Sequence, residues 1–246
     1  SMTSVGTETF FWCPSLASVT LSNSLTVLTS YMFYACTSLT DIVIPSTVKS
    51  IGDVAFRNCS SLKSISLSNN LNVIEEGAFI DCSNMVSINI PSSVTNIESF
   101  VFYECSSLET IRFNSSIPPI MGYEDEGLFS SYIPEFYVPC STKEVYLTAL
   151  NKNNIVEESR VKEIIASGIS GTNLSWKLSC DSILTISGSG AMEQYSWSAY
   201  RDAIKTVVIN EGVTTIGEWA FSSYPLTSVT IPNSVITIGD NAFIDS

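Results

Sequence analysis

The sequence repeats itself every 23 residues through its first half, and this period constrains the fold more than any other feature. The clearest copy spans residues 59–79, and further copies lie one period before it and one period after it. A unit this short cannot bury its own apolar side chains and has to stack on its neighbours. The repeat therefore predicts a solenoid in which each copy forms one coil.

Within each copy, the apolar positions predict a short strand, a second extended segment and a tight turn. Leu62, Ile65 and Leu67 point inward around the first strand. Ser64 and Ser66 alternate with them and point outward. The turn carries an apolar pair that ends in Phe, and we expect these rings to form a ladder of Phe10, Phe33, Phe56, Phe79 and Phe102. A second expected ladder contains Leu28, Ile51, Ile74, Ile97 and Ile120.

Most of the cysteines follow the same period. The periodic ones are Cys13, Cys36, Cys59, Cys82 and Cys105, and the other two are Cys140 and Cys180. An odd count of seven without a CxxC pair argues against a zinc site or a complete disulfide framework. Free cysteine packs as a small hydrophobe. We expect five stacked, reduced thiols, because a parallel ladder points the sulfur atoms in the same direction.

The regular period ends after residues 117–119. Residues 121–134 include three consecutive acids and are predicted to form an exposed excursion. Residues 136–138 predict a strand, and the capping box from Ser141 to Glu144 predicts a helix that ends near Leu150. A solenoid needs a cap over its last coil, so these elements are the candidate cap, followed by residues that lead into a linker.

The last third of the chain predicts a hairpin followed by a return of the coil pattern. Alternating apolar residues flank a turn at Asp181 and Ser182, and a short helical segment is expected from Trp197 to Ile204. The predicted division is a first repeat block at 1–120, a cap and linker at 121–165, a β-hairpin unit at 166–205 and a truncated second block at 206–246.

These residues resemble the BspA-like leucine-rich repeats of bacterial surface proteins, whose signature runs I-P-x-S-V-x-x-I-G-x-x-A-F-x-x-C-x-S-L. Residues 44–62 fit this signature almost throughout, and residues 171–192 are similar to the hairpin that often introduces such repeats in gut commensals. We therefore expect a leucine-rich-repeat solenoid, mostly β with short helical turns. Its 23-residue coils would be right-handed and form two repeat blocks, with an intervening cap and β-hairpin unit.

The resemblance also implies a location and a class of partner. Members of the family are typically secreted or surface-anchored and are linked to adhesion or host interaction. It implies an extracellular or cell-surface protein whose signal peptide has been removed. The implied partner is a host or bacterial surface protein, and a glycan is the alternative.

Composition excludes several other functions. Lys and Arg number 11 against 24 Asp and Glu, and the net charge of −13 argues against nucleic acid or an anionic membrane as partner. No apolar run approaches the roughly 20 residues that span a bilayer. The chain has no histidine, no G-x-S-x-G elbow and no P-loop. We expect no catalytic residues, no cofactor and no metal.

Carboxylates in the repeat offer one competing hypothesis. Asp53 and Glu76 share a repeat column, with Glu75 and Glu98 in the column before it. Stacked coils would line these oxygen atoms along one edge, where they are the ligand type that Ca²⁺ prefers. No aspartate-rich calcium loop accompanies them, which favours a charged edge that keeps the solenoid soluble.

The outward strand positions are the candidate partner-binding surface, which we call the strand face. It comprises Ser18, Thr20, Asp41, Val43, Ser64, Ser66, Ser87, Asn89, Thr110 and Arg112. Occasional aromatic residues such as Tyr34 and Tyr103 flank it. A face without a large apolar anchor binds weakly unless the partner supplies the hot spots. A solvated polar face without a partner is the competing interpretation.

The sequence thus predicts a non-catalytic extracellular interaction or adhesion protein of a bacterial cell surface. The alternative is a carbohydrate-binding module of a surface glycan-capture system, and a structural stalk is a third reading. A glycan binder should present exposed Trp or Tyr in a line. Trp12 and Tyr224 are scattered, whereas Trp176 and Trp197 are expected to be buried in the hairpin unit.

Overall fold

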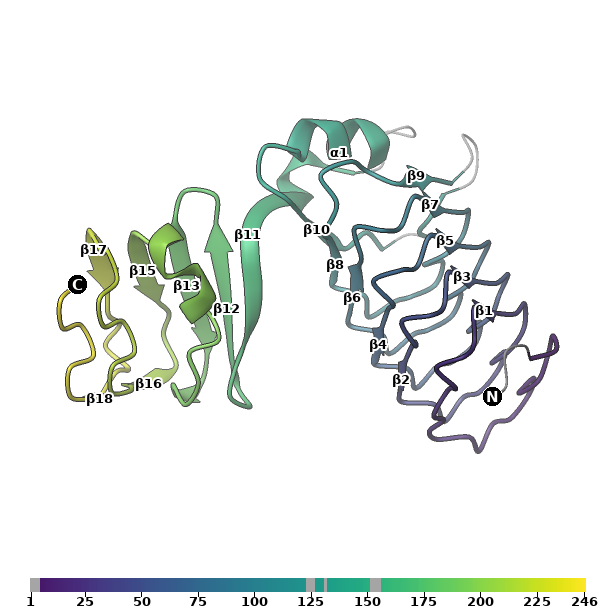
Figure 1. Cartoon of the computed structure of the whole chain (residues 1–246), viewed down its shortest axis with the longest axis horizontal. Coiled ribbons are helices and arrows are strands. Elements are labelled where there is room, and N and C mark those ends of the chain that lie inside the picture. Colours follow the sequence, from purple (N-terminus) through teal and green to yellow (C-terminus); the bar gives the residue numbers. More distant parts are fainter. Residues whose placement is uncertain (1–4, 123–126, 131, 151–155) are drawn as a thin grey trace. The chain divides into compact units, whose positions relative to one another are not determined.

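The structure is a computed structural model that describes residues 5–122, 127–130, 132–150 and 156–246. It divides into two compact units, residues 1–162 and residues 163–246 (Figure 1). Each unit has its own cluster of buried apolar side chains, and the two clusters have no residue in common. The finer division at residues 120, 165 and 205 stays a prediction.

Coils of the first unit stack through two ladders of short parallel strands. One ladder contains β1 (Val27–Leu28), β3 (Ser50–Ile51), β5 (Val73–Ile74), β7 (Asn96–Ile97) and β9 (Ile120–Met121). On the other side lie β2 (Asp41–Val43), β4 (Ser64–Ser66), β6 (Ser87–Ile90), β8 (Thr110–Phe113) and β10 (Glu135–Val138). Partners in β2 and β4, such as Ile42 and Ile65, are one period apart. The strand pairing confirms the predicted solenoid.

Buried phenylalanine rings run through the middle of these coils. From Phe10 to Phe102, successive ring centroids lie 5.1 to 6.0 Å apart, with planes within 13° of parallel. This confirms the first predicted ladder. The rings fill the space that the turns enclose, and most of them are fully buried.

The prediction that Ile120 belongs to the second ladder is wrong. Ile97 pairs with Met121 rather than with Ile120, which is 67% exposed, whereas Met121 is 7% exposed. The cause is one extra residue in this coil. Phe113 precedes Met121 by eight positions, whereas its partner Ile90 precedes Ile97 by seven.

The predicted excursion at residues 121–134 is also wrong for the parts that the structure describes. Phe129 stacks on Phe102 at 5.9 Å and meets Phe136 edge-on at 5.7 Å. The Phe102 amide donates to the Leu128 carbonyl, as in the earlier turns. The segment therefore supplies a further ring to the ladder after an insertion. The three consecutive acids of this segment, Glu124, Asp125 and Glu126, lie outside the described residues.

A strand and a helix follow, as predicted, but the helix begins differently. Helix α1 (Lys143–Leu150) follows Thr142, and Ser141 has a left-handed φ of 64°. The helix therefore begins one residue later than the predicted capping box at Ser141 requires, and that prediction is wrong. Tyr146 in α1 packs 4.9 Å from Phe113 and donates to the Ser115 carbonyl at 2.8 Å. The helix thus covers apolar residues of the last coils.

The residues expected to lead into a linker instead begin a long strand. A short helix η1 (Glu158–Arg160) leads directly into β11 (Val161–Ser170). Gly168 in β11 lies opposite Trp176, and a Cβ there would fall within 2.9 Å of the indole ring. Gly168 thus leaves room for the Trp176 ring of the neighbouring strand. The linker was predicted because the residues from 151 onward are largely polar.

The second unit begins with a hairpin and returns to coils, as predicted. Its main sheet has the order β11, β12 (Leu174–Ser179), β13 (Ile183–Gly188), β15 (Thr206–Ile209) and β17 (Ser228–Thr230). A smaller sheet contains β14 (Gly190–Ala191), β16 (Val213–Ile216) and β18 (Thr237–Ile238), and η2 (Ser198–Ala203) is a 3₁₀ helix. Trp197 stacks on Phe221 at 5.7 Å and continues the ring ladder of this unit.

Candidate functional site

The strand face forms mainly where the sequence placed it. Pairing aligns Asp41 with Ser64 and Val43 with Ser66, and it aligns Ser87 with Thr110 and Asn89 with Arg112. Ser18 and Thr20 precede the first assigned strand. All of these side chains are exposed except Thr110 and Arg112, which are half-buried. The reason is that β10 pairs with β8 alongside them.

A shallow groove of about 350 Å³ lies at the N-terminal end of the strand face. Its walls include Ser18, Thr20, Asp41 and Val43. Val43 is 69% exposed, so it offers an apolar contact within a polar surface. The Thr40 hydroxyl donates to the Asp41 carboxylate at 2.9 Å, which holds that charge beside the groove.

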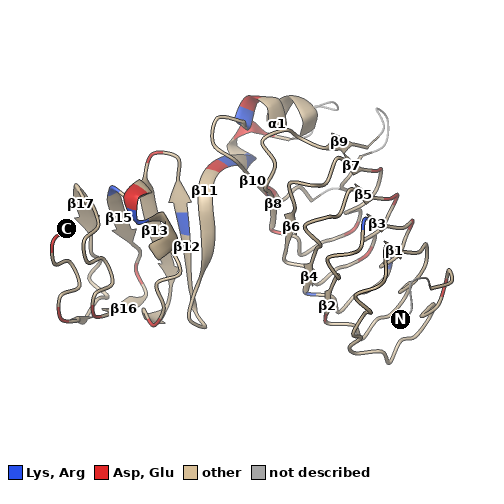
Figure 2. Ribbon diagram, in the orientation of Figure 1, with Lys and Arg blue, Asp and Glu red and all other residues tan. Residues whose placement is uncertain are grey.

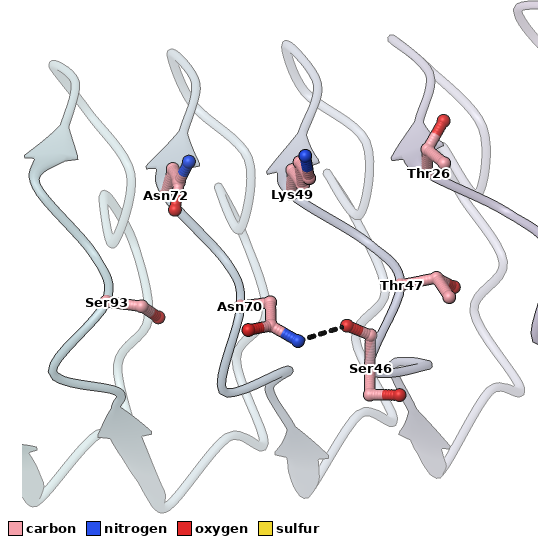
Figure 3. A pocket seen from close by; sticks show the side chains of 7 residues that line it. All are labelled: Thr26, Ser46, Thr47, Lys49, Asn70, Asn72 and Ser93. Atoms are coloured by element: carbon pink, nitrogen blue, oxygen red, sulfur yellow. Dashed lines mark hydrogen bonds between the residues drawn. The ribbon is translucent and has the colours of Figure 1, made fainter.

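A second groove of about 520 Å³, lined by polar residues, crosses the coils between the two ladders (Figure 3). Its lining is Thr26, Ser46, Thr47, Lys49, Asn70, Asn72 and Ser93. Asn70 donates to the Ser46 carbonyl at 2.8 Å, and Ser93 donates to the Leu71 carbonyl at 2.7 Å. These side chains tie one coil to the next, so the groove has a structural role.

The acidic columns also connect neighbouring coils. Glu75 accepts the Asp53 amide at 3.2 Å, and Glu98 accepts the Glu76 amide at 3.1 Å. Burial raises the pKa of Glu75, the Asp53 amide opposes this, and the charges of Glu98 and Asp53 raise it further. Within the described ranges, no group of three or more His, Cys, Asp or Glu side chains is placed to hold a metal ion.

The cysteine column has a structural role as well. From Cys36 onward, each periodic thiol donates to the carbonyl of the phenylalanine one coil earlier, for example Cys59 to Phe33 at 3.1 Å and Cys105 to Phe79 at 3.1 Å. Burial raises the pKa of Cys105 to about 12. The periodic cysteines are free, as predicted, and all of them except the half-buried Cys13 are buried. Cys140 and Cys180 are disulfide-bonded, which their positions outside the period did not reveal.

Aromatic residues recur on the turns of the first unit, and the sequence analysis named only Trp12, Tyr34 and Tyr103 among them. We call this surface the aromatic turn edge, and it comprises Phe11, Trp12, Tyr31 and Tyr34 and, three periods later, Phe100 and Tyr103. Tyr34 and Phe100 are half-buried, and the other four are exposed. Phe11 stacks on Tyr34 at 5.0 Å, and Tyr31 lies 5.9 Å from Tyr34. The signal was the period itself, because Phe11 and Tyr34 are 23 residues apart.

The other aromatic predictions have mixed outcomes. Trp176 and Trp197 are 3% and 0% exposed, which confirms that they are buried. Tyr224 is 2% exposed and is not a surface residue. Trp12 is 66% exposed and belongs to the aromatic turn edge rather than standing alone.

Parallel coils of about 23 residues, with two short strands each and a buried ring ladder, define the leucine-rich-repeat class of solenoid. The chain belongs to the BspA type leucine rich repeat family, whose repeat matches it in six copies over residues 3–130 and 151–246. No curated protein matches the chain.

Several solved structures are similar to the chain. A leucine-rich repeat protein from Bacteroides ovatus is 22% identical with a TM-score of 0.47, over 98% of this chain and 67% of that protein. A leucine rich cell surface protein from Faecalibacterium prausnitzii is 22% identical with a TM-score of 0.35, over 92% and 65%. The pneumococcal vaccine antigen PcpA is 25% identical with a TM-score of 0.43, over 55% and 40%.

The chain therefore spans between 40% and 67% of the length of these three proteins. In the part of the chain that the structure describes, no helix is long and apolar enough to cross a membrane.

Proposed function

We propose that the chain is a non-catalytic interaction or adhesion module of a bacterial cell surface, and that it binds a macromolecular partner through the strand face. The partner we favour is a host or bacterial surface protein. One observation carries the proposal: pairing of the strands holds rows of exposed polar side chains in register over several coils. Membership of the BspA type family supports the surface location.

The chemistry of the strand face supports binding rather than catalysis. Its hydroxyl groups lie on a sheet that is open to water, and the chain contains no histidine to activate them. Electrostatic stabilisation of a transition state is strongest in a site that excludes water. A flat, wet surface of this kind favours recognition.

The strand face gives less support to a glycan-capture function. Sugar rings stack on exposed aromatic side chains, and the strand face contains none. Most exposed aromatic residues of this unit lie on the turns instead. A glycan array belongs in the same experiment because it tests this alternative directly.

The test is the double variant Ser64→Lys/Ser66→Lys. Both side chains are exposed, so the free energy of unfolding should fall by well under about 1 kcal/mol. We expect the variant to lose capture of any protein that the native chain binds on an array of purified host extracellular proteins. The melting temperature should stay the same.

The matched control is Ser46→Lys/Ser92→Lys, which adds the same charge at exposed positions outside the strand face. This control should keep its binding. Unchanged capture by a folded Ser64→Lys/Ser66→Lys protein would move the binding surface off the strand face.

A further inference from the structure

The aromatic turn edge has a well-supported backbone and shares no residue with the strand face. The Trp12 amide donates to the Tyr34 carbonyl at 2.8 Å, and the Tyr31 amide donates to the Asp53 carbonyl at 3.0 Å. Bonds between coils therefore fix the backbone under the rings. Phe11 is 41% exposed and Tyr31 is 38% exposed. Side chains that are already ordered lose little entropy when a partner binds.

Carboxylates lie among the aromatic residues on the same turns. Glu8 stands one period before Tyr31, and Glu104 follows Tyr103 directly. Glu8, Glu76 and Glu104 are exposed, and Figure 2 shows that acidic residues recur from coil to coil in this unit. None of these three forms an ion pair with a residue that the structure describes, unlike Glu158, which pairs with Lys143.

The charge around the aromatic turn edge is therefore negative, and the one basic side chain among the described residues of these turns, Arg57, is half-buried. Arg57 follows Tyr34 by one period, and its Nε atom is buried without a hydrogen-bond partner among the described residues. Burial raises the pKa of Asp53 on the neighbouring coil, which means that its charged form is disfavoured. A cation placed at this edge would relieve that cost.

We propose that the aromatic turn edge binds a basic segment of a partner protein, with Lys or Arg side chains on the carboxylates and apolar side chains on the rings. Tyrosine and tryptophan are the residue types that dominate binding hot spots, and cations are attracted both to carboxylates and to aromatic rings. This surface is separate from the strand face, so the inference does not rest on the proposed function.

Charge decides between the possible occupants. A second copy of this chain carries the same net charge of −13 and would be repelled. An anionic lipid surface would be repelled for the same reason. A neutral glycan would gain nothing from the uncompensated charge, although the rings would accept it. A basic protein segment satisfies both the rings and the carboxylates.

Trp12 provides a direct reporter of binding, since it is exposed within the surface itself. Trp219 is also exposed, at 54%, so the Trp219→Phe background leaves Trp12 as the exposed indole. The probe is a short synthetic peptide of alternating lysine and leucine. We expect it to change the Trp12 emission saturably, and to bind more weakly as salt is added. The counterpart peptide of glutamate and leucine, and dextran, should have no effect.

Two variants locate the interaction. Tyr31→Ser/Tyr34→Ser should weaken peptide binding about tenfold, because it removes two anchoring rings. Glu8→Gln/Glu76→Gln/Glu104→Gln should weaken it about fivefold and reduce the salt dependence. The matched control is Glu109→Gln/Glu144→Gln/Glu157→Gln, which removes the same charge from exposed positions elsewhere in the unit. Melting temperatures show which variants are folded.

Each other outcome would overturn the proposal. Equal weakening by the charge control would mean that the peptide follows net charge rather than this surface. Equal binding of the glutamate peptide or of dextran would identify a different occupant. An unchanged affinity in the folded glutamine variant would remove the carboxylates from the site. Ser64→Lys/Ser66→Lys should leave Trp12 responsive, which separates this result from the test of the strand face.

Discussion

At the scale of single residues, the cysteine column shows that a periodic residue can be a hydrogen-bond donor rather than a reactive group. Cys82 donates to the Phe56 carbonyl at 3.2 Å, and its pKa is raised well above the ordinary value by burial. In the second unit, Ser246 stands at the same repeat position and donates to the Phe221 carbonyl at 2.5 Å. The position therefore requires a small donor and not sulfur in particular.

These thiols predict a fall in stability at alkaline pH. Unfolded cysteine has a pKa of about 8.5, whereas burial raises that of Cys105 to about 12. Between these values the unfolded chain loses protons that the folded chain keeps, so the free energy of unfolding decreases as the pH rises. Below pH ~8.5 the contribution is fully present. The free energy of unfolding, measured by denaturant titration at several pH values in this window, should fall less steeply with pH for Cys105→Ser than for the native chain. An equal dependence on pH in both proteins would contradict the assignment.

At the scale of elements, the ladder of rings carries much of the stability of the first unit. Phe79 is fully buried, with its centroid 5.5 Å from that of Phe56 and 6.0 Å from that of Phe102. Phe79→Ala should lower the free energy of unfolding by about 3–5 kcal/mol, because it empties an interior site. Chemical denaturation measures this. Phe11→Ala, at an exposed ring, is the control and should cost much less; similar losses would mean that the ladder is not the main support.

The period made most of these elements predictable, and the exceptions have local causes. The ladders follow from residues 23 apart, so Phe33, Phe56 and Phe79 were placed correctly from sequence alone. A single inserted residue moved Met121 into the place expected for Ile120. Strand β11 resembled a linker because the residues before it are polar, and its antiparallel pairing with β12 is not part of the repeat. Periodicity cannot report either effect.

The candidate site was less predictable than the fold. Alternation along a strand decides which side chains face water, and it placed Ser64 and Ser66 correctly. The aromatic turn edge was not predicted as a surface because side chains in a turn do not alternate regularly between the core and water. Phe11 and Tyr34 become neighbours only through the stacking of coils.

At the scale of the whole molecule, the chain contains two separate apolar cores. Phe221→Ala empties a fully buried site in the second unit, and we expect it to lower hydrogen-exchange protection in β12, β13 and β15. The coils between Phe33 and Phe102 should keep their protection, because stability in a solenoid depends on nearest neighbours. Hydrogen exchange followed by mass spectrometry tests this, and an equal loss of protection in both units would show that they unfold as one.

The ladder register has a genetic consequence. Each coil bonds to residues one period away, so its upper and lower surfaces are nearly interchangeable. A recombination event that removes one whole period from the regular coils would bring Phe56 against Phe102 and leave the ladders continuous. A gain or loss of one residue within a strand would turn the buried side chains of that strand toward water, whereas the insertion before Phe129 leaves the ring ladder continuous. Unequal crossing-over in such a gene can therefore lengthen or shorten the protein by whole coils, and the packing of the core stays the same.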